Sequence, residues 1–422
     1  MVQPIASFFS LYLATLLLLL GTGLFNTYMG LRLTATSVSE VWVGGLIAVY
    51  YLGLVFGARI GHKLIIQVGH IRAYAAGAAI VTVAVLLQVL TDSLWGWLAL
   101  RFIAGIATVT QFMVIESWLN EQTENHLRGR VFAFYMVFSG LGTMLGQLSL
   151  TLFPHLEYQP LIFVAICSVL CLVPLALTSR LHPAVQVPAP IHVRYYFSRV
   201  PISLMVVFIS GNLTGAFYGL GPVFAVKQGL SSDQVAVFLA AAVAAGLISQ
   251  WPLGWLADRV NRVGLMRINA VFLMLLGIPL WGFWVLPYWM LVVISCIFGI
   301  VQFTLYPIGA AFANDNVEPD RRVGLSAILL MAYGSGACLG PLVAGALMRE
   351  IGTSMFFVFV SACAAVMVLF VRPQRITGIN LTEDAPTHFV PMAELQATPV
   401  VAALDPRVDV ETDLSHEQTA PA

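Results

Sequence analysis

Long runs of apolar residues, separated by short polar turns, recur along most of this chain. Each run is close to the ~20 residues that an α-helix needs to cross a hydrocarbon layer of ~30 Å. A soluble domain carries charge on about a quarter of its residues, whereas only 9% of this chain is charged and 59% is hydrophobic. None of the runs alternates with the period of barrel strands. The chain is therefore expected to be an all-α integral membrane protein.

Twelve of these runs are predicted to cross the membrane as helices. They lie near residues 8–33, 41–60, 73–91, 94–117, 131–152, 160–179, 201–226, 233–257, 268–286, 288–313, 324–348 and 352–371. The seventh run contains Gly219, Gly221 and Pro222, and the tenth contains Pro307. We expect these two helices to be broken at those residues, where hinge motion can concentrate.

The basic residues are divided unequally between the two sides of the membrane. If the N-terminus lies inside the cell, fifteen of the 20 Lys and Arg fall on the cytoplasmic side and three on the outer side. The fifteen are Arg59, Lys63, Arg72, Arg128, Arg130, Arg180, Arg194, Arg199, Arg259, Arg262, Arg267, Arg321, Arg322, Arg372 and Arg375, and the three are Arg32, Lys227 and Arg349. This bias predicts a multi-pass protein of the inner (plasma) membrane with both termini cytoplasmic. Because the first run follows no basic segment and is too long for a signal core, it is expected to remain as a span.

An internal repeat divides the chain into two halves. A shift of 194 residues lays residues 101–146 on residues 295–340 without a gap. Identities then fall at Ile103/Ile297, Gly105/Gly299, Ile106/Ile300, Thr110/Thr304, Asn120/Asn314, Glu124/Glu318, Arg128/Arg322, Gly140/Gly334, Gly142/Gly336, Leu145/Leu339 and Gly146/Gly340. Because glycine spacing and loop charges recur together, the repeat is structural rather than a chance likeness of apolar helices. We expect an N-terminal six-helix bundle (1–180), a cytoplasmic linker (181–200) and a C-terminal six-helix bundle (201–375).

The last part of the chain differs in composition from the rest. Residues 376–422 hold eight acidic residues against one basic residue, Arg407, and contain five prolines. This composition predicts a disordered, solvated cytoplasmic tail. The alternative is a segment that docks on a partner.

The turn after the eighth run combines a glycine with fixed charges, as Gly254-Trp-Leu-Ala-Asp258-Arg259-Val-Asn-Arg262. Gly254 lets a second helix approach closely, and the Asp258 carboxylate is suited to the positive N-terminal end of another helix. These residues resemble the loop motif of the major facilitator superfamily (MFS). The first half has a reduced copy, in which Gly61 replaces the acid; it consists of Gly57, Gly61, Lys63 and Arg72.

Other short motifs support the same resemblance over roughly residues 8–372. Arg101-Phe-Ile-Ala-Gly105, Glu116-Ser, Trp251-Pro-Leu-Gly254 and Thr304-Leu-Tyr306-Pro307 look most like the bacterial YcaD-like group of the superfamily. The resemblance implies the MFS fold, two pseudo-symmetric six-helix bundles, and a transporter. From the repeat and the charged turn we hypothesise alternating access, in which Asp258 faces the start of the fifth span, near Gly129 and Arg130, and holds the cytoplasmic side shut.

Two charged residues within spans are candidates for coupling, because a charge inside the membrane is costly. Arg101 lies about two turns into the fourth span and resembles the arginine motif that the superfamily associates with proton coupling. Its alternative role is an arginine that snorkels to the interface. Glu116 ends the same helix, and is either a proton carrier or a gate residue paired with Arg128, Arg130 or Arg72.

The resemblance places the first, fourth, seventh and tenth spans around a central solute cavity. The polar and aromatic candidates on these spans are Asn26, Tyr28, Gln111, Asn212, Tyr218, Gln302 and Tyr306. Asn26 and Asn212 occupy comparable places in the two halves, although each could instead form an interhelical hydrogen bond. Neutral groups in an aromatic setting favour a weakly polar or amphiphilic solute, and Arg101 would tolerate a monoanion.

The sequence gives no support to an enzyme. It lacks a phosphate-binding loop and a His-Glu-x-x-His motif, and its five cysteines lie within spans without a Cys-x-x-Cys pair. We expect no cofactor, no metal and no nucleic-acid partner, but a small-molecule solute, membrane lipid and, if transport is coupled, protons. The protein is expected to act as a monomer. The alternative function is a transporter-like receptor or sensor that signals through the acidic tail.

Overall fold

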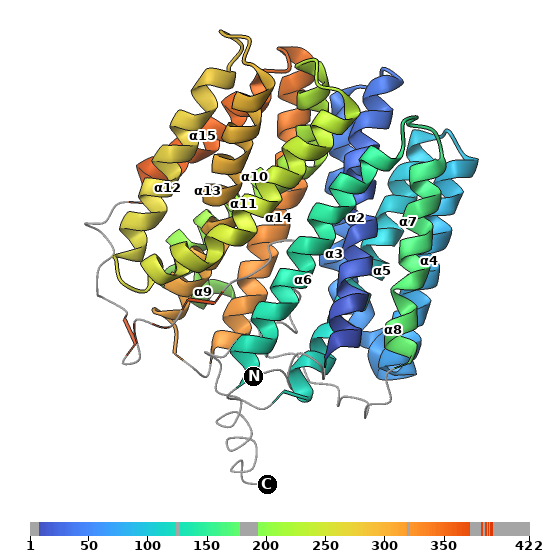
Figure 1. Cartoon of the computed structure of the whole chain (residues 1–422). Coiled ribbons are helices and arrows are strands. Elements are labelled where there is room, and N and C mark those ends of the chain that lie inside the picture. The colour runs from blue at the N-terminus through green and yellow to red at the C-terminus, as the bar shows by residue number, and fades with distance from the viewer. Residues whose placement is uncertain are drawn as a thin grey trace.

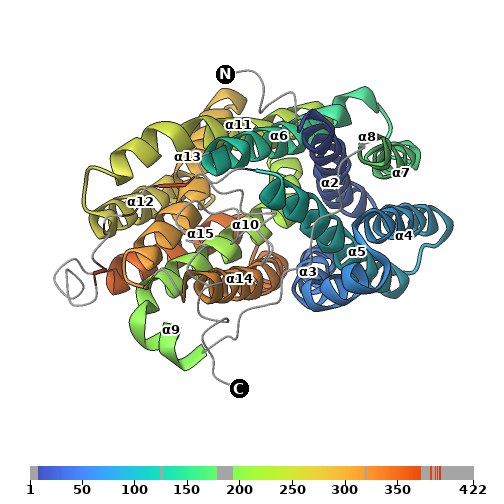
Figure 2. The ribbon, with the colours of Figure 1, turned by 90° about the horizontal axis from the view of Figure 1, so that it is seen from below.

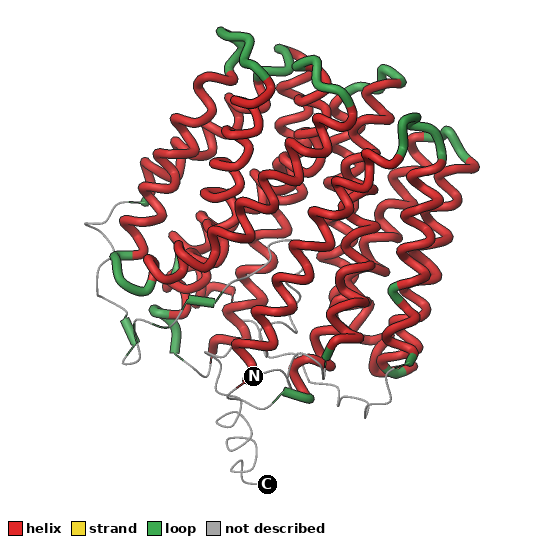
Figure 3. Tube along the Cα trace, in the orientation of Figure 1, coloured by secondary structure: helices red, strands yellow, loops and turns green. Residues whose placement is uncertain are grey.

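The bundle is formed almost entirely by long helices that run up and down between two faces (Figures 1 and 3). The structure is a computed structural model, and it describes residues 8–123, 127–177, 193–318 and 321–371, together with residues 381, 382, 385, 387, 389 and 390. Helix α2 rises from the lower face of Figure 1, and the spans after it alternate in direction. We call these two sides the lower face and the upper face.

Within the described ranges, each of the twelve predicted spans corresponds to helix. The first half contains α2 (Phe9–Ala35), α3 (Glu40–Val68), α4 (His70–Leu90), α5 (Leu94–Glu121), α6 (Arg128–Leu148) continued by η2 (Ser149–Leu152), and α7 (Gln159–Leu170) with α8 (Leu172–Ala176). The second contains α10 (Pro201–Lys227), α11 (Ser232–Ala257), α12 (Arg262–Gly277) continued by η3 (Ile278–Leu280), α13 (Tyr288–Asn314), α14 (Arg322–Glu350) and α15 (Met355–Phe370). Eleven are long and apolar enough to cross a membrane, and α15 is a shorter apolar helix.

The same helix pairs meet in both halves. Helix α2 packs on α6 as α10 packs on α14, and α3 packs on α5 as α11 packs on α13. A Cβ atom added at Gly146 would lie 2.2 Å from the Leu20 carbonyl oxygen, and one added at Gly340 would lie 2.1 Å from that of Asn212. These two glycines are equivalent in the 194-residue repeat. The repeat therefore preserves the positions at which helix backbones touch, and the prediction of two six-helix halves is confirmed.

Three helices of each half form the contact between the two halves. Helix α3 packs beside α14 and α6 beside α11, as the view from below shows (Figure 2). Helix α10 also contacts α2 and α3, and it is the most buried of the long spans. The surfaces on which one half could move against the other are therefore formed by α2, α3, α6, α10, α11 and α14.

Some expected details differ from the structure. Helix α10 continues through Pro222 and α13 through Pro307, so the predicted breaks in these spans are wrong. Membrane helices tolerate proline because neighbouring groups satisfy the freed carbonyl. The break that does occur is at Cys171, between α7 and α8.

Two segments expected outside the bundles are partly ordered. Part of the linker assigned to 181–200 forms α9 (Val193–Arg199), while residues 181–192 lie outside the described residues. In the tail, the described residues between 381 and 390 contact the body of the protein instead of standing free. Residues 391–422 lie outside the described residues.

Candidate functional site

The turn between α11 and α12 separates the roles of its two arginines. Asn261 caps α12, accepting hydrogen bonds from the backbone N–H groups of Val263 and Gly264 at 2.9 and 3.3 Å. The exposed Arg259 turns outward, with its guanidinium carbon 3.9 Å from the ring centroid of Trp255. Arg262 turns inward instead and is buried. Only Arg262 of the two is therefore placed to organise charge inside the protein.

Arg262 lies between two carboxylates. Its Nη1 donates to Asp315 Oδ2 at 2.6 Å, and its Nη2 donates to Asp258 Oδ1 at 3.0 Å. Its Nε donates to the Ala257 carbonyl oxygen at 3.2 Å. Asp315 follows the last residue of α13 and was not among the residues predicted from the sequence. A signal was available, because the 194-residue shift places Asp315 on another acid, Glu121.

Asp258 accepts hydrogen bonds from two directions. Besides Arg262, the backbone N–H of Phe389 donates to Asp258 Oδ1 at 2.8 Å. Gly129 and Arg130, at the start of α6, are exposed on the lower face. The expected contact between Asp258 and this end of α6 stays a prediction.

The first-half copy of the motif is a packing surface. A Cβ atom at Gly57 would lie 2.6 Å from the Ile106 Cα, and one at Gly61 would lie 2.5 Å from Thr110 Oγ1. These glycines let α3 lie directly on α5, so an acid in place of Gly61 would have no room. The basic side chains predicted to act with them lie toward the lower face: Lys63, Arg72 and Arg130 are exposed and Arg128 is half-buried.

Arg101 is enclosed by the first half. It is 1% exposed, its Nη2 donates to Asn26 Oδ1 at 2.7 Å, and its guanidinium carbon lies 4.5 Å from the ring centroids of both Phe25 and Tyr50. The Nε atom has no hydrogen-bond partner among the described residues. Arg101 therefore does not snorkel, and it meets aromatic faces and an amide rather than a carboxylate. The structure brings together two residues, Arg101 and Asn26, that were predicted for separate roles.

Glu116 is fully buried toward the lower end of the same helix. The hydroxyl of Tyr135, on α6, donates to Glu116 Oε1 at 3.1 Å. Glu116 follows Arg101 by fifteen positions, which correspond to about 22 Å along the helix at 1.5 Å per residue. The two candidate coupling residues thus occupy separate levels of the bundle.

The remaining cavity candidates are buried and do not form one cluster. Gln302 donates to Thr214 Oγ1 and to the Ser210 carbonyl oxygen, both at 2.9 Å, and so connects α13 to α10. Asn212 donates to the Phe208 carbonyl oxygen of its own helix at 2.9 Å, unlike Asn26. The others reach different parts of the bundle: Tyr28 donates to the Glu157 carbonyl oxygen, Gln111 to Cys171 Sγ, and the rings of Tyr218 and Tyr306 pack on Phe303 and Tyr333.

The upper face carries an ion pair between the halves. Lys227, at the end of α10, donates to Glu40, at the start of α3. Close contacts between the halves accompany it: a Cβ atom at Gly44 would lie 2.2 Å from the Pro341 carbonyl oxygen, and one at Gly30 would lie 2.9 Å from Pro222 Cβ. Neither charged residue was predicted as a site residue, although the sequence prediction put Lys227 among only three basic residues of the outer side. Both halves are held together at this face.

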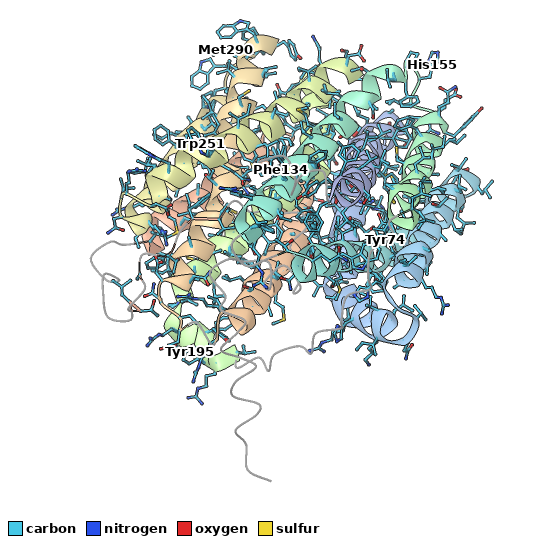
Figure 4. The ribbon with its side chains drawn as sticks, turned by 60° about the horizontal axis from the view of Figure 1, so that its bottom comes forward. Tyr74, Phe134, His155, Tyr195, Trp251 and Met290 are labelled. Carbon is cyan, nitrogen blue, oxygen red and sulfur yellow. The ribbon has the colours of Figure 1, made fainter. Side chains whose placement is uncertain are left out.

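The linker helix α9 is anchored at the lower face, where Figure 4 labels Tyr195. Arg199 Nη2 donates to Glu318 Oε1 at 2.9 Å, and the Tyr195 hydroxyl donates to the same carboxylate. The hydrogen bond from Tyr195, with the nearby charges of Arg199 and Arg321, lowers the pKa of Glu318 below its ordinary value despite partial burial. Burial and the Glu318 carboxylate raise the pKa of Tyr195. The linker is therefore attached to the second half through an ionised Glu318.

Known proteins resemble the chain in both sequence and fold. Residues 11–304 and 270–404 match the family profile described as Major Facilitator Superfamily. An uncharacterized MFS-type transporter of Yersinia pestis (strain Pestoides F) is 30% identical over 364 residues, which cover 85% of this chain and 94% of the relative. The uncharacterized MFS-type transporter YcaD of Salmonella newport (strain SL254) is 29% identical over 356 residues, covering 84% and 92%.

Two solved structures share the fold at low sequence identity. The nucleoside transporter NupG superposes with a TM-score of 0.70 at 16% identity, covering 86% of this chain and 96% of NupG. A bacterial homolog of the human lysosomal transporter Spinster superposes with a TM-score of 0.65 at 15% identity, covering 95% and 97%. The relatives named here are transporters, so they do not favour the receptor alternative. With its twelve helices in two halves, the chain belongs to the major facilitator superfamily and is a multi-pass membrane transporter.

Proposed function

We propose that this transporter moves a small, weakly polar or amphiphilic solute across the inner (plasma) membrane by alternating access. The lower face is assigned to the cytoplasm, because exposed basic side chains such as Lys63, Arg72 and Arg130 lie there. The observation that carries the proposal is the enclosed Arg101, a buried cation that lies among neutral groups of two other helices, α2 and α3. Uncompensated charges inside a membrane protein mark solute or ion pathways.

The surroundings of Arg101 favour a particular solute chemistry. The rings of Phe25 and Tyr50 offer apolar faces, and the Asn26 amide offers hydrogen bonds. The Nε–H of Arg101 donates no hydrogen bond to the described residues. An amphiphilic solute with one acceptor group, either neutral or monoanionic, would satisfy that donor while its apolar part covers the rings. A multiply charged solute would face too few polar partners.

The contacts between the halves supply the rest of the mechanism. The Lys227–Glu40 ion pair and the glycine contacts at the upper face support a state that is closed on the outer side. Rocking of one half against the other would break these contacts and expose the Arg101 region to that side. In the opposite state, Asp258 is proposed to reach the start of α6 and close the lower face.

Proton coupling is part of the same proposal. Glu116 is a buried carboxyl at the lower end of α5, and it receives a hydrogen bond from Tyr135. A carboxyl in such a place can exchange a proton when the lower side opens. Arg101, about 22 Å away along the helix, would contact the solute when the upper side opens.

The experiment is solute flux into proteoliposomes with and without a pH gradient. The panel contains matched neutral, monoanionic and dianionic amphiphiles of similar size. We expect flux of a neutral or monoanionic member, loss of that flux in Arg101→Met, and normal flux in Arg267→Gln, which alters an exposed basic residue of the lower face. If Glu116 carries the proton, Glu116→Gln should still exchange solute across the membrane, but a pH gradient should no longer accelerate its solute flux. Equal flux in wild-type and Arg101→Met liposomes would exclude the assigned site.

A further inference from the structure

A short segment close to the C-terminal end of the described chain lies on the α11–α12 turn. Its described residues, Leu381, Thr382, Ala385, Thr387, Phe389 and Val390, are here called the strap. The strap belongs to the part of the chain whose acidic composition predicts a free tail. Its contacts are made with the charged motif of the second half.

The strap is fixed at the buried Arg262–Asp315 pair. The backbone N–H and the hydroxyl of Thr387 both donate to Asp315 Oδ1 at 2.8 Å, and Arg262 Nη2 donates to the Thr387 carbonyl oxygen. The backbone N–H of Thr382 donates to the Asp315 carbonyl oxygen at 3.0 Å. Thr387 is 7% exposed. These bonds involve ionised groups out of water, where a hydrogen bond is stronger than at the surface.

Phe389 covers the glycine of the motif. A Cβ atom at Gly254 would lie 2.3 Å from Phe389 Cδ1 and 3.1 Å from Phe389 Cγ, so the ring rests on bare backbone. The Phe389 N–H donates to Asp258 Oδ1. The strap thus covers the surface that a glycine leaves for a neighbouring helix, and it uses the carboxylate next to that surface.

Val390 is buried at the end of the strap. It is 4% exposed and belongs to a buried apolar cluster that contains Phe132 of α6 and Leu325 of α14. The strap is therefore bonded to the second half through Thr387 and Phe389, and its next residue joins an apolar cluster shared by both halves at the lower end.

We propose that the strap is an autoinhibitory element, which holds the transporter in the state closed at the upper face. This inference rests on the alternating access proposed above. The strap covers the surface of Gly254 and Asp258, and closing of the lower face is proposed to use that surface. The strap must leave Gly254 and Asp258 before α6 can approach them.

The docking is tested by a cross-link. A sulfur atom in place of Phe389 Cγ would lie 3.1 Å from a Cβ atom at residue 254, close to the ~3 Å that bond geometry sets between these atoms across a disulfide. The test protein combines Gly254→Cys with Phe389→Cys and lacks the five native cysteines. A protease site is inserted within its residues 372–380. We expect the C-terminal peptide to stay attached after oxidation and cleavage, and to be released by reductant. The two single-cysteine proteins should release it in either case. Release from the oxidised double variant would overturn the proposal.

The regulatory effect is tested by labelling at the upper face. Ile47 is 1% exposed and its Cγ1 lies 2.9 Å from a Cβ atom placed at Gly219 of the other half, so Ile47→Cys reports opening there. With a membrane-impermeant maleimide, we expect labelling to be about three- to tenfold faster in Phe389→Ala, which loses the half-buried ring on Gly254 but keeps the backbone N–H. The deletion of 377–422 removes the whole strap and should speed labelling at least as much. The deletion of 391–422 retains the strap and should label like wild type.

A variant that breaks the Lys227–Glu40 ion pair distinguishes failure of the autoinhibitory role from failure of alternating access. Glu40→Gln should speed Ile47→Cys labelling whether or not the strap is present. If Glu40→Gln acts and the strap variants do not, the autoinhibitory role is wrong while alternating access stands. If neither acts, the rocking motion itself is wrong, and the strap proposal falls with it.

Discussion

Arg262 and Asp315 are 53 residues apart in sequence, yet their side chains form an ion pair of 2.6 Å in which each is at most 6% exposed. The pair joins the start of α12 to the end of α13 at the lower face. A buried pair of this kind contributes little over an apolar contact, but leaving one partner alone is strongly destabilising. The charged turn is therefore a structural joint as well as a proposed gate.

The first prediction concerns this joint. Asp315→Ala leaves the buried Arg262 guanidinium with Asp258 as its remaining carboxylate partner, so we expect a loss of about 1 to 3 kcal/mol in stability. The measurement is thermal unfolding of the purified protein in detergent. Glu350→Ala removes an exposed acid of the upper face and is the control, with a change below about 0.5 kcal/mol. Identical melting of the two variants would show that Asp315 is not a structural partner.

The second prediction separates stability from transport at Arg101. Asn26→Leu with Arg101→Met removes a buried cation that pairs with an amide instead of a carboxylate. We expect the double variant to gain about 1 to 2 kcal/mol in stability, because burial of a lone charge is costly, and to lose solute flux. Thermal unfolding and proteoliposome flux measure the two effects. Arg267→Met, at an exposed basic residue of the lower face, should change neither the melting nor the flux. A less stable double variant would contradict the assigned cost.

The third prediction concerns the upper ion pair. Because Lys227 and Glu40 are 39% and 10% exposed, the pair is worth about 0.5 to 1 kcal/mol. Glu40→Lys alone should therefore raise upper-face labelling of Ile47→Cys at least about two- to fivefold. The exchange of both charges, Glu40→Lys with Lys227→Glu, should restore slow labelling. Fast labelling in the exchanged protein would mean that the two side chains do not act as a pair.

The fourth prediction is a pH dependence of the linker. The folded-state pKa of Glu318 is lowered, so its contribution to docking of α9 is present above the ordinary glutamate pKa and is lost as pH falls through the lower folded value. We expect amide exchange of residues 193–199, corrected for the intrinsic rate, to accelerate below about pH 4.5. Glu318→Gln should show weaker protection at neutral pH and no such step. Tyr195→Phe should shift the step to higher pH, since its hydroxyl is the largest cause of the lowered pKa.

The sequence predicted the architecture well because membrane insertion imposes simple rules. Apolar runs of the right length and the 194-residue repeat identify twelve helices in two halves, and the repeat glycines Gly146 and Gly340 do lie at helix contacts. Helix continuity through Pro222 was not predictable in this way, because it depends on which neighbours satisfy the freed carbonyl.

Partnerships between distant residues were less accessible to sequence reasoning. Asp315 and Glu40 are single acids at helix ends, and only the fold shows that they face Arg262 and Lys227. The contacts of the strap were missed because of its composition. Its acidic surroundings dominate the composition, whereas Thr387 and Phe389 bind through backbone groups that composition does not report.

The last prediction concerns the glycines of the first-half motif. Gly57→Ala would place a methyl group 2.6 Å from both the Ile106 Cα and Val109 Cγ1. Because the Ile106 atom is backbone, α3 would have to move away from α5, and we expect a loss of about 1 to 3 kcal/mol in stability. Gly45→Ala, in the same helix, is the control, since its nearest atom would be Leu98 Cδ2 at 3.8 Å. That control should gain a few tenths to about 1 kcal/mol from helix propensity. Thermal unfolding in detergent measures both changes. Equal effects of the two substitutions would show that close contact at Gly57 does not fix α3 on α5.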